Sequence, residues 1–165
     1  MISKLSDTTP LGLRLWAQEV QSVFNNYIHV VQVPVSSLGT GNYMLHGKHV
    51  TNQLQVGETC YIEFIVPHSI NEFKEVTIRF LGTVTGTFNY TVNLSYGPVG
   101  GDENASTKTI TVNGATATDD QIGEIDITSL FSDQAAGDQI GVELIANAFT
   151  TTTDIHVLDL YVKYI

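Results

Sequence analysis

An every-second-residue alternation of apolar and polar side chains, beginning at Cys60, constrains the fold of this chain most strongly. It runs through residues 58–66, 76–81 and 88–96. Successive side chains of an extended chain point to opposite faces, so this period predicts strands that bury one face. The apolar series are Cys60, Ile62, Phe64 and Val66; Val76, Ile78 and Phe80; and Phe88, Tyr90, Val92 and Leu94. Pro67 is expected to end the first strand, because proline cannot donate to a sheet.

Further strands are predicted downstream by β-branched runs between turn signals. They cover residues 107–112, 124–127, 140–144 and 157–165. The last two are predicted to pair as a long-tipped hairpin joined by residues 147–153, with Leu158, Leu160, Val162 and Tyr164 sharing one face of the final strand. No strand–helix–strand alternation occurs. The pattern therefore predicts an all-β fold, an antiparallel jelly-roll-like β-sandwich.

A different period precedes the strands. Apolar residues at alternating spacings of three and four predict a short N-terminal helical arm with one apolar stripe. This stripe consists of Leu13, Trp16, Val20, Val23 and Tyr27. We expect it either to pack on its own domain or to bind outside it, to other subunits or to a partner such as a capsid lattice. In the second case it is an oligomerisation and docking surface. The β-branched run 28–35 predicts an edge strand, and the glycine- and serine-rich segment 36–42 predicts a linker. The expected division is an arm and linker at 1–42 and a sandwich domain at 43–165.

The net charge of the chain limits the classes of molecule that it is expected to bind. Seven basic residues against 17 acidic ones give a net charge of −10, which argues against nucleic acid or an anionic membrane as a partner. Cys60 is the only cysteine, so it has no intrachain disulfide partner and is expected to be a buried thiol. The first residues lack the apolar run of a signal peptide, and no stretch predicts a membrane span.

The strand blocks resemble a known group of domains. The blocks are residues 61–67, 76–80, 125–130, 136–142 and 157–164. Over residues 58–165 the chain resembles β-sandwich domains among the virion proteins of tailed bacteriophages. The resemblance implies a non-enzymatic structural protein of a phage-like particle, such as a capsid decoration protein, head fibre or tail-associated protein. It also implies a virion location after assembly in the host cytoplasm, and a homo-oligomer, commonly a trimer, that docks on capsid or other virion proteins. It supplies no catalytic residues and no cofactor.

A carbohydrate- or receptor-binding module of a fibre is the main alternative. Exposed aromatic side chains stack on sugars, and loops on a rigid scaffold carry recognition. Tyr43, Tyr90, Tyr96 and Phe149 are the aromatic candidates, of which Tyr96 and Phe149 are the predicted ligand platform. The loops at 97–106 and 146–154 are the expected recognition sites.

Catalytic and metal-binding signals are weak. Glu63 and Glu143 lie mid-strand, and two carboxylates on one sheet face are compatible with a polysaccharide hydrolase, which we rank below the binding roles. His46 and His49 flank an expected turn without further ligands, so no metal site is predicted there. The acidic residues in two loops are expected to be solvated. They are Asp102 and Glu103, beside Asn104, in the first loop, and Asp119 and Asp120 in the second.

Overall fold

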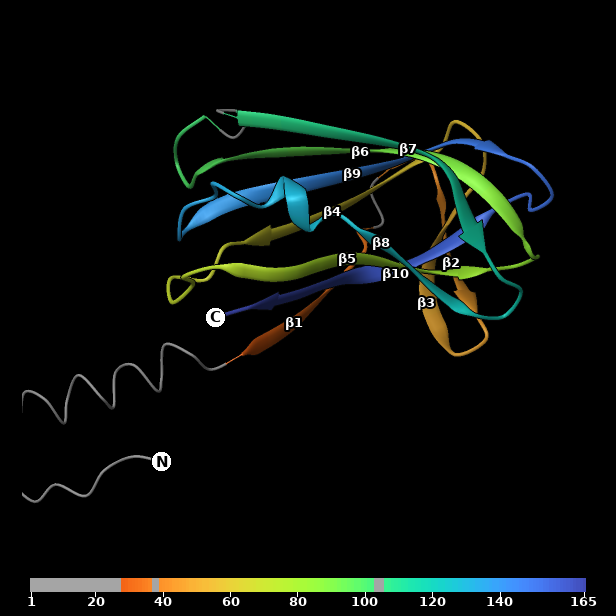
Figure 1. Ribbon diagram of the computed structural model, residues 1–165, viewed down its shortest axis with the longest axis horizontal. Coiled ribbons are helices and arrows are strands. Elements are labelled where there is room, and N and C mark those ends of the chain that lie inside the picture. Colours follow the sequence, from red (N-terminus) through yellow and green to blue (C-terminus); the bar gives the residue numbers. More distant parts are fainter. Residues whose placement is uncertain (1–27, 37–38, 103–105) are drawn as a thin grey trace, which may run out of the picture.

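Two stacked antiparallel sheets make up the computed structural model, which describes residues 28–36, 39–102 and 106–165 (Figure 1). Sheet A has the order β2-β3-β10-β5-β8, with β1 also paired to β10, and sheet B has the order β4-β9-β6-β7. Sheet A contains β1 (His29–Pro34), β2 (Asn42–His46), β3 (His49–Leu54), β5 (Phe73–Gly82), β8 (Ile122–Asp126) and β10 (Ile155–Tyr164). Sheet B contains β4 (Thr59–Ile65), β6 (Gly86–Pro98), β7 (Ser106–Ala117) and β9 (Asp138–Phe149). The predicted all-β, jelly-roll-like sandwich is confirmed.

The core lies between the sheets, on the face that the alternation predicted. In β6 the even-numbered side chains from Phe88 to Tyr96 are buried, while the residues between them are partly exposed. Phe80 of sheet A meets Phe88 of sheet B edge to face, with ring centroids 5.2 Å apart. Cys60 is fully buried, as expected. Burial raises the pKa of its thiol to about 12, because the charged thiolate is disfavoured away from water.

The predicted hairpin between the last two strands is wrong. β9 pairs with β4 and β6 in sheet B, whereas β10 pairs with β1, β3 and β5 in sheet A. Residues 150–154 carry the chain from one sheet to the other. Both strands bury an apolar face, so they can line the same interior from opposite sides without being neighbours. The last strand, β10, nevertheless lies in the interior of sheet A, between β3 and β5.

A bulge in β10 changes which residues face the core. The register with β5 shifts between Val157 and Asp159. Ile155 and Val157 are buried before the shift, and Leu160 and Val162 are buried after it, so the inward positions change from odd to even numbers. Leu158 is therefore only partly buried, although the simple alternation predicted it to face inward with Leu160. An extra residue in a strand reverses the side-chain parity beyond it.

The sandwich starts upstream of the predicted boundary after residue 42. β1 pairs with β10 over six positions, from His29 opposite Tyr164 to Pro34 opposite Asp159. Val33 and Val35 are buried in the core. The predicted edge strand is thus confirmed, and it belongs to sheet A. The helical arm and its stripe, Leu13, Trp16, Val20, Val23 and Tyr27, lie outside the described residues. The predicted arm-and-linker segment at 1–42 therefore includes β1, a strand of sheet A.

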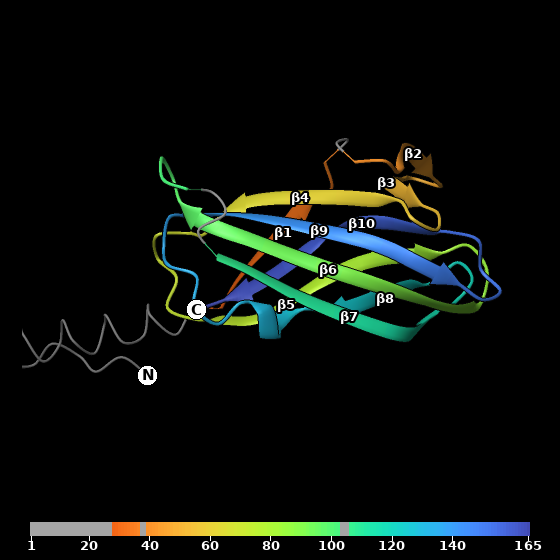
Figure 2. The same cartoon turned by 90° about the horizontal axis from the view of Figure 1, so that it is seen from above.

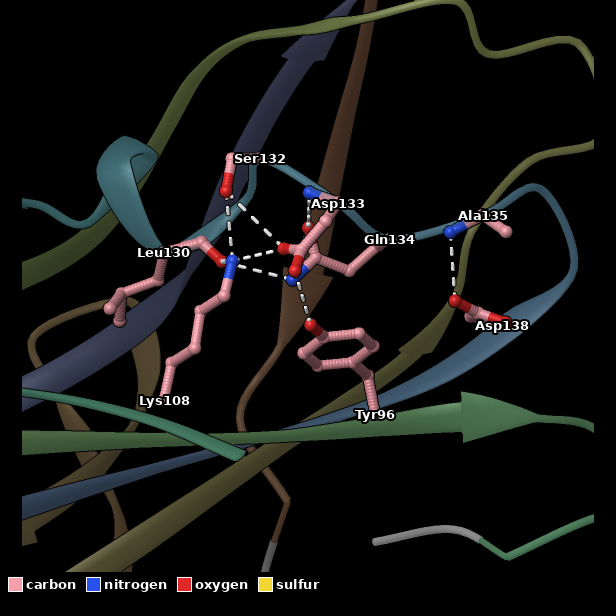
Figure 3. Close-up of polar contacts among 8 residues, drawn as sticks. All are labelled: Tyr96, Lys108, Leu130, Ser132, Asp133, Gln134, Ala135 and Asp138. Carbon is pink, nitrogen blue, oxygen red and sulfur yellow. Dashed lines mark hydrogen bonds and ion pairs between the residues drawn. The ribbon is translucent and has the colours of Figure 1, made fainter. Parts of the chain in front are cut away.

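The turn between β8 and β9 is fastened to sheet B by a lysine (Figure 3). It begins with the short 3-10 helix η1 (Thr128–Leu130). Lys108 Nζ donates to Leu130 O at 3.0 Å and to Ser132 Oγ at 2.9 Å, and it forms an ion pair with Asp133. Tyr96 Oη donates to Asp133 Oδ2 at 2.9 Å. The pKa of Asp133 is lowered, first by Lys108 and then by Tyr96. The lysine therefore points back over the core rather than away from the sheet edge.

Candidate ligand-binding groove on sheet B

A continuous polar row crosses the outer face of sheet B. Tyr61 of β4 lies opposite Glu143 of β9, Glu143 lies opposite Asn93 of β6, and Asn93 lies opposite Thr109 of β7. Their side chains are hydrogen-bonded from end to end. Tyr61 Oη donates to Glu143 Oε1 at 2.8 Å, Asn93 Nδ2 donates to Glu143 Oε2 at 2.7 Å, and Thr109 Oγ1 donates to Asn93 Oδ1 at 2.9 Å. The row holds four polar side chains in fixed positions.

The next row is hollow because a glycine occupies its centre. Gly141 of β9 lies between Glu63 of β4 and Ser95 of β6, and Ser95 lies opposite Thr107 of β7. A Cβ added at Gly141 would lie 3.2 Å from Ser95 Oγ and would meet no backbone within 4 Å. Glycine is unfavourable in a strand interior and often marks a bulge, a bend, or the close approach of a ligand or another backbone. Here it leaves a depression beside the polar row.

Together the two rows form a groove of about 480 Å³ on sheet B. Figure 2 looks onto this sheet, with β4, β9, β6 and β7 side by side. All four strands contribute to the groove. Its lining residues are Tyr61, Glu63, Asn93, Leu94, Ser95, Thr107, Thr109, Gln139, Ile140, Gly141 and Glu143.

Carboxylates and neutral polar groups dominate the electrostatics of the groove. Both oxygens of Glu143 accept hydrogen bonds, so this side chain is oriented before any ligand arrives. The pKa of Tyr61 is raised, mainly because its hydroxyl donates to the Glu143 carboxylate and would lose that bond on ionisation. Glu63 is exposed. The described lining includes no lysine or arginine, so the groove suits neutral ligands rich in hydroxyl groups better than anionic ones.

The structure does not bring the predicted platform residues Tyr96 and Phe149 together. Phe149 lies opposite Phe88, while Tyr96 lies eight residues further along β6, opposite Ile140. Tyr96 is only 7% exposed and packs in the core, with Lys108 Nζ 5.7 Å from its ring centroid. Phe149 packs partly buried against the core and stacks on Phe88 at 5.9 Å. The Tyr96 ring is buried and one face of the Phe149 ring is covered by Phe88, so these two residues do not form the expected platform.

Of the other two aromatic candidates, one is buried and one is exposed. Tyr90 is buried in the core at 5% exposure, whereas Tyr43 on β2 is 51% exposed. Tyr61, which lines the groove, was not among the candidates. The sequence does indicate that Tyr61 faces outward, because its even-numbered neighbours in the strand are apolar.

The expected recognition loop after β9 is hydrogen-bonded to the start of β6 and to the turn before it. Thr150 Oγ1 donates to Thr87 O at 3.0 Å, and Thr151 Oγ1 donates to Thr85 O at 3.1 Å. Thr152 is buried, and its hydroxyl donates to Asp154 O at 2.8 Å. These threonine hydroxyls hold the loop in place rather than presenting it to a ligand.

The two carboxylates considered for hydrolysis both line the groove. Glu63 lies opposite Gly141, so Glu143 is its diagonal neighbour on the adjacent strand. Diagonal neighbours lie about 7–8 Å apart between Cα atoms. Glu143 is held as an acceptor by Tyr61 and Asn93, which suits an anchoring role better than proton donation.

Neither a metal centre nor a membrane helix is present in the described part of the chain. No group of three or more His, Cys, Asp or Glu side chains is placed to hold a metal ion there. His46 and His49 flank a two-residue turn in the β2–β3 hairpin, as expected. No helix in the same residues is long and apolar enough to cross a membrane.

Comparisons with known proteins identify similar solved structures but no matching family or curated protein. No family model matches the sequence, and no curated protein matches it. Among solved structures, the xylan-binding module CBM15 aligns with a TM-score of 0.48 and 12% identity, covering 84% of this chain and 97% of that one. The CBM36-1 domain of a multidomain xylanase from the hindgut metagenome of Trinervitermes trinervoides aligns with a TM-score of 0.44 and 14% identity, covering 82% and 96%. A family two carbohydrate esterase from Cellvibrio japonicus aligns with a TM-score of 0.46 and 11% identity over 84% of this chain, but only 35% of the esterase is covered.

Proposed function

We propose that this protein is a carbohydrate-binding module whose ligand site is the groove on sheet B, and that its ligands are neutral polysaccharides. The observation that carries the proposal is the hydrogen-bonded row from Tyr61 to Thr109 beside the depression at Gly141. The glycan partner, an alternative in the sequence interpretation, thereby replaces the virion role as the preferred function. The virion role and the trimer stay predictions, and no contact among the described residues favours them.

The groove offers the chemistry that a sugar chain requires. Sugar hydroxyls both donate and accept, and they match the carboxylate, amide and hydroxyl groups that line this site. Because Tyr61, Glu143 and Asn93 are already bonded to one another, they lose little conformational freedom when a ligand binds. The Tyr61 ring adds an amphipathic surface at the groove wall. Gly141 leaves space for a ring to approach the strand.

A larger side chain at position 141 tests the site, because it would fill the depression. Gly141→Val adds a branched side chain at a central position of β9 and removes none of the polar groups. The added Cβ approaches only Ser95 Oγ, at 3.2 Å, and strands favour valine over glycine. The variant should keep the melting temperature of the native protein or raise it. Binding to soluble neutral polysaccharides, measured by affinity electrophoresis and calorimetry, should weaken by about tenfold or more.

The matched control is Thr116→Val, which changes an exposed residue of the same sheet outside the groove. It should bind like the native protein. Equal binding by Gly141→Val and the native protein would place the glycan site elsewhere, and absence of binding across a panel of neutral polysaccharides would contradict the proposed function.

The same panel of polysaccharides also tests whether the protein hydrolyses its ligand. A polysaccharide hydrolase would release reducing ends from a polymer that it binds, and Glu63→Gln or Glu143→Gln would abolish that release. We expect the native protein to bind without releasing reducing ends.

A further inference from the structure

The two edges of sheet B differ in how they are covered. On the β4 edge, backbone groups bond to the preceding segment: Ser36 N donates to Tyr61 O at 2.8 Å, and Thr40 N donates to Thr59 O at 3.1 Å. On the β7 edge, no described segment pairs with the strand on the side away from β6. In Figure 2, β7 runs along the margin of the sheet. An unpaired row of backbone N–H and C=O groups is a template for another strand.

β7 also lacks the usual protection against such pairing along its first part. Its outward side chains there are threonines, Thr107, Thr109 and Thr111. Its single charged residue, Lys108, is turned inward and bound to the turn after η1. A bulge interrupts the strand only beyond Val112, where Gly114 has a φ of +77°. Exposed lysines, prolines and bulges are the common means of blocking an edge, and residues 106–112 contain none of them on the exposed side.

We propose that two copies of this protein pair antiparallel through β7, about a two-fold axis at Thr109. In this register Thr107 lies opposite Thr111 of the second copy, and Ser106 lies opposite Val112. Because Thr109 is the midpoint of the regular stretch 106–112, every residue of that stretch pairs with a residue of the second copy. Cross-strand threonine pairs stabilise antiparallel sheets, whereas like charges directly opposite one another destabilise them. Here each Lys108 lies opposite Ile110, so no like charges are opposed.

The pairing has a consequence for the ligand site, and this part rests on the proposed function. Thr107 and Thr109 form the β7 end of the groove. Two-fold pairing at Thr109 places the grooves of both copies end to end across one continuous sheet. The second copy then contributes its own Thr107 and Thr109 to a site twice as long. A polysaccharide chain that spans both grooves binds more tightly than a short oligosaccharide, because the second contact is intramolecular.

Cysteine cross-linking tests both the partner and the register. Directly opposed residues of antiparallel strands have Cα atoms about 4.5–5.5 Å apart, within the range that a disulfide spans. Thr109→Cys should therefore form a covalent dimer on mild oxidation. Thr116→Cys lies on the same strand beyond the bulge and is the matched control, which should stay uncross-linked. Cys60 is buried, and the pKa of its thiol is about 12, so it does not compete.

The native protein should have twice the 18.0 kDa chain mass in light scattering, without oxidation. A native monomer or trimer over a dilution series would overturn the proposal, as would equal cross-linking of the Thr109→Cys and Thr116→Cys variants. Glycan binding is scored separately on the native protein. If Thr109→Cys cross-links while the native protein binds no polysaccharide, the β7 interface stands and the proposed function is refuted. A monomer that binds polysaccharide refutes the interface alone.

Discussion

The imidazole rings of His46 and His156 lie 4.5 Å apart, centroid to centroid, where the β2–β3 hairpin lies beside β10 in sheet A. His156 is only 4% exposed, and its Nδ1 lies 3.1 Å from Thr51 Oγ1 of β3. The pKa of His156 is lowered, first by burial and then by His46, while Asp154 acts in the opposite direction. Asp120 lies 3.9 Å from His46 Nε2. Protonation of both rings would thus place two positive charges in contact.

Acid should therefore destabilise the fold through His156. In the unfolded chain this histidine takes up a proton near pH 6.5, the ordinary pKa of the side chain, whereas the folded state binds that proton only at lower pH. The contribution of neutral His156 to the free energy of unfolding is therefore fully present above pH 6.5. It is lost as the pH falls through the lowered pKa of the folded state. Urea midpoints measured on both sides of pH 6.5 should fall more steeply for the native protein than for His156→Gln. Parallel pH profiles of the two proteins would contradict this.

Removal of the Tyr61 hydroxyl should weaken glycan binding without harming the fold. Tyr61→Phe keeps the ring at the groove wall. It frees Glu143 Oε1, which in the native protein accepts a hydrogen bond from the Tyr61 hydroxyl at 2.8 Å. A hydrogen bond that positions an acceptor contributes about 0.5–1.5 kcal/mol, so the dissociation constant should rise about two- to tenfold. Calorimetry with the preferred polysaccharide measures the change, and Thr116→Val is again the control. An unchanged affinity would show that the polar row does not contact the ligand.

The strand faces were predictable because side-chain parity is a local property of the sequence. Tyr96 illustrates this well. It continues the even-numbered series of Phe88, Tyr90, Val92 and Leu94, and the parity alone places it in the core, where the structure has it. The platform hypothesis failed because it gave more weight to the aromatic residue type than to that parity.

The groove was not predictable, because it depends on the register between strands distant in the sequence. Tyr61 and Glu143 are 82 residues apart, and Asn93 and Glu143 are 50 apart. Periodicity places each of them on an outward face but does not say which residues lie opposite one another. The bulge at Leu158 and the passage of residues 150–154 between the sheets escape prediction for a related reason. Both are settled by tertiary packing rather than by local pattern.

Arg79 and Asp159 form a paired contact that should stabilise the centre of sheet A. Arg79 Nε donates to Asp159 Oδ1 at 2.7 Å, and Arg79 Nη2 donates to Oδ2 at 2.5 Å. The two side chains are 22% and 16% exposed, so they are shielded better than a surface pair. Asp159→Asn should lower the free energy of unfolding by about 1.5–3 kcal/mol, because the guanidinium loses its charged partner.

A double-mutant cycle separates this interaction from other effects of the changes. Arg79→Met, Asp159→Asn and the double variant, compared by urea unfolding, should show a coupling free energy of about 1 kcal/mol or more. The exposed pair of Lys74 and Glu72 is the control, and its coupling should be close to zero. Equal coupling in the two pairs would mean that the bidentate geometry adds nothing.

The Cys60 thiol should report on opening of the sandwich. It is fully buried on β4 opposite Leu144, and burial raises its pKa to about 12. The thiolate is the reactive form, so a thiol reagent at mildly alkaline pH should not modify the folded protein, whereas the urea-unfolded chain should react at once. Cys60→Ser should be destabilised by about 1–3 kcal/mol, because it buries a more polar hydroxyl group. Rapid modification of the folded protein would show that β4 separates from β9 far more readily than its paired position in sheet B implies.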